Sequence, residues 1–441
     1  MKLPDHILAC LDRLEAAGFV AYVVGGCVRD ACLGLTPHDY DICTSALPEE
    51  TEAVFSGQRL VLAGKKHGTV GVVLEGGVVE ITTFRTEGCY RDNRHPEWVA
   101  FVSDIEKDLA RRDFTVNAMA YSPSRGFTDP FGGREDLKCR ILRAVGDPNL
   151  RFGEDSLRIL RGVRFAVRFG LTLDPETGAA MNSLAHLMDN LARERVFDEL
   201  CRLLPLVTAP DLLRFSGVLC QVIPELAPLV GYDQKNAHHI HDLYTHTALV
   251  AARCPADLSL RWAALLHDIG KPDTMTIGGD GQAHYHGHAA RSAEMADAIL
   301  RRLKAPTALR EQAVVLIEKH MTLPLPEKKY LRRHLGKLGP ETMDRLLTLQ
   351  EADTLATGTA HDAELTLFSQ VRALLSGIQE ENACLSLRDL ALNGHDLMAL
   401  GYRGREIGQA LNRLLELVLE EQCENTREAL LSRLTAKEET L

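Results

Sequence analysis

The spacing of hydrophobic residues changes along the chain. Before about residue 120, short runs of β-branched and aromatic residues are bounded by glycine. FVAYVV precedes a glycine pair, DYDIC follows, and HGTVGVVLEGGVVEITTF has the pattern of two strands joined by a glycine turn. After about residue 145 the hydrophobic residues recur with helical spacing nearly to the C-terminus. The pattern predicts a small α/β head with a mixed sheet, followed by an all-α body.

The length of the chain and the breaks in the helical pattern suggest four regions. At 441 residues the chain is too long for one ordinary domain. We expect a head over residues 1–145, a helical neck over residues 146–230, a histidine-rich domain over residues 231–360 and a helical tail over residues 361–441. The sequence contains no convincing internal repeat and no low-complexity segment.

Composition narrows the class of protein. Hydrophobic residues make up 45% of the chain and charged residues 25%, which is the balance of a soluble globular protein. No apolar run approaches the roughly 18 residues that cross a bilayer. The eleven cysteines form no C-x-x-C pair, which favours reduced thiols over a disulfide framework or a zinc knuckle. We therefore expect a cytoplasmic protein that binds no membrane.

Charge adds one local feature to this picture. The net charge of −11 argues against a protein that coats nucleic acid without specificity. One predicted helix nevertheless carries an arginine stripe with no acid within it, on the side opposite its apolar residues. The stripe consists of Arg158, Arg161, Arg164 and Arg168. A solvated helix face is one interpretation; we favour a stripe that binds the phosphates of a nucleotide, because a solvated face usually includes acids.

A glycine pair precedes a predicted helix in VVGGCVRD. Gly25 and Gly26 let the backbone approach a ligand closely, and the free amides at a helix N-terminus attract phosphate oxygens. Arg29 lies within reach of the same place. This segment predicts contacts with a nucleotide phosphate.

Three acidic residues are expected to converge near this segment. Asp39 and Asp41 are two residues apart on a predicted strand, so their side chains point to one face, and Glu80 lies on a neighbouring strand. Two carboxylates this close repel each other unless a cation holds them, and hard oxygen ligands suit Mg²⁺. Such a set can activate a 3′-hydroxyl and stabilise leaving pyrophosphate. We predict that all three acids are catalytic and that the two aspartates bind Mg²⁺; ordinary surface acids are the alternative.

The order of these motifs resembles that of a known class of enzyme. GGxVRD followed by DxD looks like the nucleotidyltransferase head of the polymerase-beta superfamily, in the class that holds bacterial class II CCA-adding enzymes and bacterial poly(A) polymerases. RRDFTVN, DPFGGREDL, GEDSLRILRGVRF and ERVFDEL resemble further motifs of that class in the same order. The resemblance covers roughly residues 15–205. It implies a polymerase-beta-like head that transfers nucleotides with Mg²⁺.

The resemblance also implies roles for RRDFTVN. Arg112 would reach the triphosphate of a bound nucleotide, while Asp113 and Asn117 would hydrogen-bond its ribose hydroxyls. A capped helix, with Asp113 as the N-cap, is the alternative.

Asp155 and Arg158 are implied to select the base. We place them at i and i+3 of one helix, where side chains are neighbours. The carboxylate accepts from the exocyclic amine of cytosine or adenine and the guanidinium donates to a ring nitrogen, whereas uracil and guanine present a carbonyl oxygen to the carboxylate. The pair would accept CTP and ATP; a surface salt bridge between Glu154 and Arg158 is the alternative.

The subclass depends on weaker signals. Poly(A) polymerases of this class usually carry an arginine-rich segment where this chain has AGKKHGTVGVV, and a basic C-terminus where this chain is acidic. The segment from Arg85 to Phe101 resembles a flexible loop that CC-adding enzymes lack, and its movement could re-aim the base-selecting pair. We expect addition of CCA to tRNA from CTP and ATP. A-only addition and a poly(A) polymerase stay open.

A second set of metal-binding residues lies in the histidine-rich domain. His246, the adjacent pair His267 and Asp268 followed by GKP, and Asp353 occur in the order of the HD phosphohydrolase superfamily, which this region resembles. The resemblance implies that these four residues bind one divalent metal. Imidazole with carboxylate suits Mn²⁺, Co²⁺, Ni²⁺, Fe²⁺ or Zn²⁺.

Further histidines follow in the same domain. His288 and His320 are candidates for binding a second metal, whereas we expect His284 and His286 in a surface loop. Hydrolysis of phosphoesters during repair of tRNA 3′ ends is one role for the domain, and structure or RNA binding is another. An HD phosphohydrolase whose head only binds tRNA is the rival of another class.

The tail contains NGHDLMALGYRGREIGQALNRLLELV, which resembles the C-terminal segment that these enzymes are taken to place on the tRNA body. Gly401 and Gly404 before a helix could offer amides to a phosphate. A simple helical packing unit is the alternative, and the oligomeric state stays open.

Overall fold

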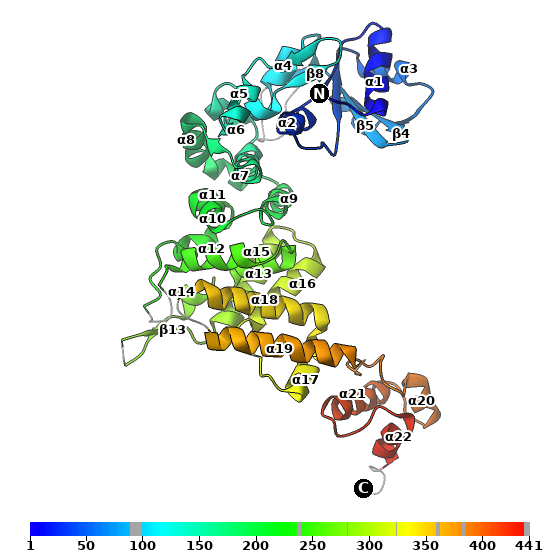
Figure 1. Ribbon diagram of the computed structural model, residues 1–441, viewed down its shortest axis with the longest axis vertical. Helices are drawn as coiled ribbons and strands as arrows, with labels where there is room; N and C mark the ends of the chain where they lie inside the picture. The colour runs from blue at the N-terminus through cyan, green and yellow to red at the C-terminus, as the bar shows by residue number, and fades with distance from the viewer. Residues whose placement is uncertain are drawn as a thin grey trace. The chain divides into compact units, whose positions relative to one another are not determined.

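The computed structural model describes residues 1–88, 99–235, 240–279, 281–322, 324–358, 362–381 and 384–435. The chain divides into two compact units (Figure 1). The first unit comprises Met1–Val207 and Arg214–Ala227, and the second comprises Thr208–Leu213 and Pro228–Leu441. An N-terminal mixed sheet followed by a mostly helical body confirms the predicted fold class.

The head is built on a seven-stranded sheet with strand order β3-β4-β5-β2-β1-β8-β9. Its strands are β1 (Ala21–Val24), β2 (Asp41–Thr44), β3 (Arg59–Val61), β4 (Thr69–Leu74), β5 (Gly77–Thr83), β8 (Ala120–Ser122) and β9 (Gly126–Thr128). Strands β2 and β5 are parallel, and the other neighbours are antiparallel. The predicted hairpin is confirmed as β4 and β5, with Leu74 opposite Gly77.

The centre of the sheet is covered on both faces. Every residue of β1 is buried, which explains why AYVV lacks polar alternation. Tyr22 and Val24 belong to one hydrophobic cluster with Phe84 and Leu109. Around the sheet lie α1 (Asp5–Ala16), α2 (Gly26–Cys32), α3 (Pro48–Val54), α4 (Ile105–Ala110), α5 (Gly133–Lys138), the 3₁₀ turns η1 (Lys65–His67) and η2 (Thr115–Asn117), and the separate pair β6 (Arg85–Glu87) and β7 (Val99–Phe101).

A helical neck completes the first unit. Its elements are α6 (Pro148–Glu154), α7 (Leu157–Phe169), α8 (Pro175–Ser183), η3 (Ala185–Asn190), α9 (Arg193–Leu203), α11 (Ser216–Val222), η4 (Pro224–Leu229) and the pair β10 (Ile141–Leu142) and β11 (Thr172–Leu173), with α10 (Ala209–Arg214) at the unit boundary. Helix α7 packs closely on the head because Gly162 has no side chain: a Cβ there would lie 2.9 Å from the ring of Phe114. The neck thereby brings the start of α7 to the head motifs.

The second unit is almost entirely helical. It contains α12 (Leu243–Arg253), α13 (Leu258–Leu266), α14 (Lys271–Thr274), α15 (His288–Arg302), α16 (Thr307–Lys319), α17 (Lys328–Leu338), α18 (Pro340–Ala356), α19 (Asp362–Glu380), α20 (Gly394–Ala399), α21 (Arg405–Leu419), α22 (Arg427–Thr435) and the small hairpin β12 (Thr276–Ile277) and β13 (Ala283–His284). Helices α17 to α19 share one hydrophobic cluster and the last three helices share another.

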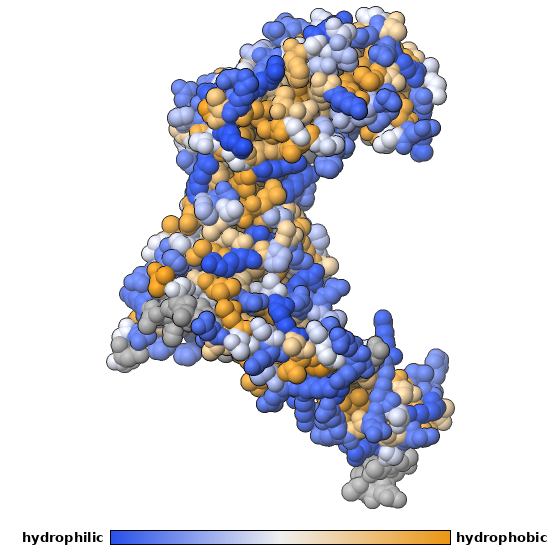
Figure 2. Space-filling view, viewed as in Figure 1, coloured by the Kyte–Doolittle hydropathy of each residue, from blue (hydrophilic) through white to orange (hydrophobic). Residues whose placement is uncertain are grey.

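The surface and the thiols agree with the composition. Hydrophilic side chains cover much of the face shown in Figure 2, with smaller hydrophobic patches between them. Within the described ranges, no helix is both long and apolar enough to cross a membrane. Each cysteine in those ranges is a free thiol.

Candidate functional site

The three predicted catalytic acids line one pocket, here called the acid pocket (Asp39, Asp41 and Glu80). Strand β2 begins at Asp41, so Asp39 lies in the loop before it, and the prediction that both aspartates occupy the strand is wrong for Asp39. The parallel register that pairs Ile42 with Ile81 brings Glu80 alongside Asp41. All three residues are exposed at the surface, although the packing around the Asp41 carboxylate partly desolvates it.

The electrostatics of Asp41 fit a bound cation. Desolvation raises the pKa of Asp41; the guanidinium of Arg112 lowers it, and the charges of Glu80 and Asp39 raise it further. A divalent cation would relieve the repulsion between these carboxylates, and their oxygens are the ligands that Mg²⁺ prefers. The acids nevertheless do not form a closed cage. Among the described residues, only two groups in the second unit have three or more ligand atoms all within 4.8 Å of one another.

A second pocket, here called the arginine pocket, shares Asp41 with the acid pocket and reaches the start of α7. Predicted residues that line it are Gly25, Gly26, Arg29, Asp41, Arg112, Asp113, Asn117, Asp155, Arg158 and Arg161. Sequence reasoning did not single out four further lining residues, namely Arg111, Leu157, Phe165 and Arg195. Because Asp41 lines both pockets, the carboxylates and the arginines belong to one continuous site.

Glycine is required at the floor of the arginine pocket. Gly25 caps the N-terminus of α2 with φ of +72°, a conformation that L side chains rarely adopt. A Cβ at this position would lie 2.8 Å from Nη1 of Arg112. The sequence predicts that a ligand approaches the glycine pair closely; in this structure the side chain that does so is that of Arg112.

Asp113 and Asn117 hold the neck to the head. Arg161 donates to Oδ2 of Asp113 through Nη2 at 2.6 Å and through Nε at 2.9 Å. Asn117 donates to Oδ1 of Asp113 at 3.0 Å and accepts from Nη1 of Arg29 at 2.5 Å. The side chains of Asp113 and Asn117 also line the arginine pocket, and the amide nitrogen of Asn117 carries a second hydrogen, so a ribose hydroxyl could add to this network. The residue that caps η2 is Phe114, so the alternative with Asp113 as N-cap is wrong.

The pKa of Asp113 reflects this network. Burial raises it, but Arg161 and Asn117 outweigh burial and lower it to about 2. The carboxylate is therefore ionised and firmly held at neutral pH.

Asp155 stands between two helices. It follows α6 with an extended backbone (φ −140°, ψ 101°), so the prediction that Asp155 and Arg158 occupy one helix is wrong. The amide of Leu157 donates to Oδ1 of Asp155 at 3.1 Å, and Nη2 of Arg195 donates to Oδ2 at 2.8 Å. Although the helical spacing fails, Asp155 and Arg158 line the same pocket.

Arg158 is held by the surrounding chain. Its Nη1 donates to Oε2 of Glu154 at 2.7 Å and to the carbonyl of Arg151 at 2.9 Å, and its Nη2 donates to the carbonyl of Arg111 at 3.1 Å. The alternative salt bridge with Glu154 is therefore present. It does not exclude base selection, because the pair fixes Arg158 at the pocket wall.

Three of the four arginines in the stripe pair with acids, and the fourth, Arg168, is exposed. Arg164 and Glu199 form a buried pair at 2.6 Å between α7 and α9, and Arg164 does not line the arginine pocket. Arg161 pairs with Asp113, as described above. The partners of Arg161 and Arg164 are distant in sequence, so helical spacing alone does not reveal them.

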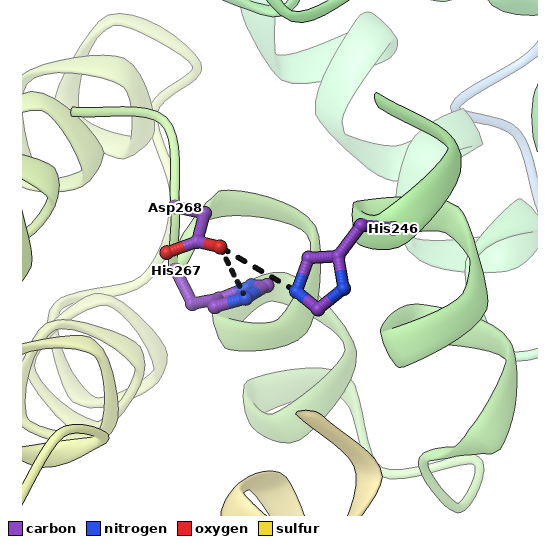
Figure 3. Close-up of side chains that lie close together, drawn as sticks. All are labelled: His246, His267 and Asp268. Atoms are coloured by element: carbon purple, nitrogen blue, oxygen red, sulfur yellow. Dashed lines mark ion pairs between the residues drawn. The ribbon is translucent and has the colours of Figure 1, made fainter. Parts of the chain in front are cut away.

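The second unit contains a histidine–aspartate centre, which consists of five buried residues and the partly exposed Asp353; the buried ones are His246, His267, Asp268, His288 and His320. Nε2 of His246 lies 3.0 Å from Oδ1 of Asp353, and Nε2 of His267 lies 3.2 Å from Oδ2 of Asp268. Figure 3 shows the rings of His246 and His267 converging on Asp268. The four residues predicted to bind one metal therefore lie together.

The ring orientation of every histidine suits a metal ligand. Each Nδ1 faces a backbone carbonyl, which can only accept a hydrogen bond, so Nδ1 carries the proton and Nε2 presents its lone pair to the centre. The distances from Nδ1 to the carbonyl oxygen are 3.4 Å for His246, 2.9 Å for His267, 2.7 Å for His288 and 2.6 Å for His320.

The centre divides into two overlapping groups. One consists of His246, His267 and Asp268; the other consists of Asp268, His288 and His320, so Asp268 is common to both. His288 and His320, predicted for a second metal, thus join the same centre. His284 and His286, predicted for a surface loop, are exposed, but His284 lies in β13, so the loop prediction is wrong for that residue.

The charges at the centre call for a cation. Burial alone would lower the pKa of His267, but Asp268 and Asp353 raise it to about 10, so without a metal Nε2 is protonated, and a bound metal would take the place of that proton. Burial and the charge of His267 lower the pKa of His320 to about 4. Lys271, the lysine of GKP, places Nζ 2.7 Å from Oδ2 of Asp268.

Most of the predicted flexible loop, residues 89–98, lies outside the described residues. The two ends of the loop pair with each other as β6 and β7.

The two glycines predicted to offer amides in the tail, Gly401 and Gly404, have positive φ angles of 95° and 55°. Gly404 caps the N-terminus of α21.

Known protein families match three stretches of the chain. Residues 21–143 match the "Poly A polymerase head domain", residues 170–229 match the "Probable RNA and SrmB- binding site of polymerase A", and residues 243–358 match the "HD domain". The order of these matches agrees with the head, the neck and the histidine–aspartate centre described above.

Similarity over nearly the whole chain to two CCA-adding enzymes links the three stretches. The CCA-adding enzyme of Geobacillus stearothermophilus is 33% identical over 449 residues, covering 100% of this chain and 99% of that protein. That of Latilactobacillus sakei subsp. sakei (strain 23K) is 33% identical over 429 residues, covering 96% of each. The alignment with the CCA-adding enzyme of Streptococcus thermophilus (strain CNRZ 1066) is local, with 49% identity over 197 residues and 48% of that protein covered.

Solved structures show the same similarity. The Bacillus stearothermophilus CCA-adding enzyme in complex with CTP aligns over 100% of both chains with a TM-score of 0.69 and 28% identity. The Thermotoga maritima CCA-adding enzyme complexed with tRNA aligns over 98% of this chain and 96% of that chain with a TM-score of 0.57 and 21% identity, a likeness of fold.

Proposed function

The chain belongs to the CCA-adding enzymes, the tRNA nucleotidyltransferases that build CCA on tRNA 3′ ends from CTP and ATP, and on this premise we propose how its residues carry the reaction. The observation that supports the proposal is the position of Asp41, which lines both the acid pocket and the arginine pocket. A triphosphate in the arginine pocket would therefore extend toward the acids.

The acid pocket is the proposed catalytic centre. The 3′-oxygen of tRNA forms a bond to the α-phosphorus of the nucleotide, and the bond between the α-phosphorus and the bridging oxygen breaks to release pyrophosphate. Asp39 and Asp41 are the proposed ligands of Mg²⁺, which would supply charge neutralisation at the phosphate. Glu80 assists removal of the proton from the 3′-hydroxyl.

The arginine pocket is the proposed nucleotide site. Arg112, beside Gly25, faces the triphosphate, while Asp155 and Arg158 face the base. Asp155 accepts from the exocyclic amine of cytosine or adenine, and uracil or guanine would oppose a carbonyl oxygen to it. Such a mispaired polar contact costs roughly 1–3 kcal/mol, enough to disfavour UTP and GTP.

The decisive experiment offers each nucleoside triphosphate separately, with Mg²⁺, to tRNAs that end before CCA, at C and at CC. We expect CTP to extend the two shorter tRNAs and ATP to add one residue to the longest. Use of ATP alone on the CC-ending tRNA would instead identify an A-adding enzyme. Unlimited addition of A without use of CTP would identify a poly(A) polymerase.

A second proposed activity belongs to the histidine–aspartate centre, because its imidazoles are buried and oriented for a divalent transition metal. The chemistry fits hydrolysis of a phosphomonoester or a 2′,3′-cyclic phosphate. His246, His267, Asp268 and Asp353 would hold the metal, and Lys271 would add positive charge for a phosphate.

This activity is tested separately from nucleotide addition. Protein loaded with Mn²⁺, Co²⁺ or Ni²⁺ is incubated with p-nitrophenyl phosphate and with 2′,3′-cyclic AMP, and Asp268→Asn serves as the inactive control. Product formation that Asp268→Asn abolishes would support the proposal. Absence of product with every metal would leave a metal-binding structural domain.

A further inference from the structure

Asp108 is a completely buried carboxylate behind the arginine pocket. It lies on α4, four residues before Arg112, and none of its surface reaches solvent. It lines neither the arginine pocket nor the acid pocket. A buried carboxylate is costly unless donors surround it.

Those donors are the two arginines of the RRDFTVN motif. Arg111 donates to Oδ1 of Asp108 through Nε at 3.0 Å and through Nη2 at 2.9 Å, and the amide of Arg85 adds a bond at 3.3 Å. Arg112 donates to Oδ2 through Nη2 at 3.2 Å, and Sγ of Cys43 lies 3.8 Å from the same oxygen. A single carboxylate therefore holds both arginines.

Arg112 lies between Asp108 and Asp41. Its Nη2 is 3.5 Å from Sγ of Cys43, and Cys43 and Asp41 are two residues apart on β2, where side chains share a face. Arg112 and Asp41 also line the same pocket and interact electrostatically. If Asp108 did not hold Arg112, the guanidinium would be free to form an ion pair with the nearby carboxylate of Asp41.

We propose that Asp108 is a positioning residue for nucleotidyl transfer: it holds Arg112 from behind, which aims the guanidinium at the triphosphate and leaves Asp41 available to a divalent metal. The inference rests on the proposed role of Asp41. Asp108 also holds Arg111, whose backbone carbonyl accepts a hydrogen bond from Arg158. The same carboxylate therefore helps to position the arginine proposed to select the base.

The test is the Mg²⁺ dependence of CTP incorporation by Asp108→Asn, which keeps the side-chain size but removes the charge. We expect the half-saturating Mg²⁺ concentration to rise about tenfold or more, as when an outer partner of a metal ligand is lost. The KM for CTP should rise as well. At saturating Mg²⁺, the fold-decrease in kcat should be smaller than the fold-decrease in Mg²⁺ affinity.

The matched control is Asp104→Asn on the same helix. Asp104 is exposed and caps α4 by accepting from the amide of Glu106 at 2.9 Å; asparagine can make the same cap, so this variant should leave both the fold and the Mg²⁺ dependence unchanged. An unchanged half-saturating Mg²⁺ concentration in Asp108→Asn would overturn the inference, whatever happens to stability.

A double variant shows whether the effect passes through Arg112. Arg112→Met weakens CTP binding but leaves no guanidinium to block Asp41, so Asp108→Asn combined with Arg112→Met should have the same half-saturating Mg²⁺ concentration as Arg112→Met alone. A higher value in the double variant would contradict the inference. If Asp108→Asn does not fold, Asp108→Glu replaces it, with a smaller shift in the same direction expected and no shift contradicting the inference. Wild-type protein without Mg²⁺-dependent CTP incorporation would instead refute the proposed function.

Discussion

The two candidate metal sites of this chain differ in how completely the protein builds them. In the acid pocket, three exposed acidic residues come from a loop and two strands and do not close on one another. In the histidine–aspartate centre, four histidines and Asp268 are buried, Asp353 closes one side, and backbone carbonyls fix the histidine rings. The acid pocket needs further metal ligands from outside the protein, whereas in the histidine–aspartate centre the protein itself offers a full set of candidate ligands.

Coordination chemistry explains the difference. Mg²⁺ keeps several waters and is usually bound by one or two carboxylates plus substrate phosphates, so a catalytic site for it is open. Transition metals bind imidazole strongly, and outer partners that orient the rings strengthen them as ligands. We expect metal in the head to arrive with the nucleotide and metal in the second unit to remain bound without substrate.

The largest expected effect is on the open site. Asp41→Ala should reduce nucleotide incorporation by about 10³-fold, because it removes a metal ligand and leaves charge at the reacting phosphate uncompensated. Metal retained by the second unit should not change. Glu75→Ala, which removes an exposed acid from the adjacent hairpin turn, is the control. Wild-type incorporation rates in Asp41→Ala would remove the basis of the comparison.

The next effect is on the closed site. His267→Ala should weaken transition-metal binding about 10- to 100-fold, measured as metal retained after dialysis, while CTP incorporation stays at the wild-type rate. His286→Ala removes an exposed histidine of the same domain and should retain metal normally. Loss of nucleotide incorporation in His267→Ala would show that the two sites are not independent.

The two sites also differ in how far their residues could be predicted. The histidine–aspartate centre follows from an adjacent His267-Asp268 pair and from single ligands on helices, and the predicted ligands do lie together. The arrangement around the arginine pocket depends on side-chain pairs that join distant parts of the chain. Arg161 meets Asp113, and Arg164 meets Glu199, across 48 and 35 residues of sequence.

Local geometry accounts for the remaining errors. Helical periodicity runs through Asp155 because its neighbours are helical on both sides, yet its extended backbone ends α6. The strand prediction is wrong for Asp39 because β2 begins two residues later, at Asp41. Arg195 had one available signal, its position in the ERVFDEL motif, but no spacing could place it beside Asp155, 40 residues earlier.

A smaller effect tests the floor of the arginine pocket. Gly25→Ala should raise the KM for CTP about 30-fold, because the new Cβ displaces Arg112 and so weakens binding by about 2 kcal/mol; the strain of a positive φ should lower stability as well. Gly34→Ala separates these causes: Gly34 has φ of +73° but open space around its Cβ position. Equal KM values in the two variants would mean that backbone strain alone explains the change.

The smallest effect concerns a buried acid of the head that is paired with arginine and not with a metal. The pKa of Asp113 is about 2 in the folded protein against an ordinary value of 3.8, since Arg161 and Asn117 overcome the effect of burial. Its contribution to stability is therefore present above about pH 4 and is lost as the pH falls toward about pH 2. Between about pH 5 and about pH 3 the loss should be about 1 kcal/mol, seen as a shrinking difference in Tm between wild type and Asp113→Asn. Because no metal is involved, the difference should be the same with and without a chelator; a chelator-dependent difference would assign the acid sensitivity to a metal site.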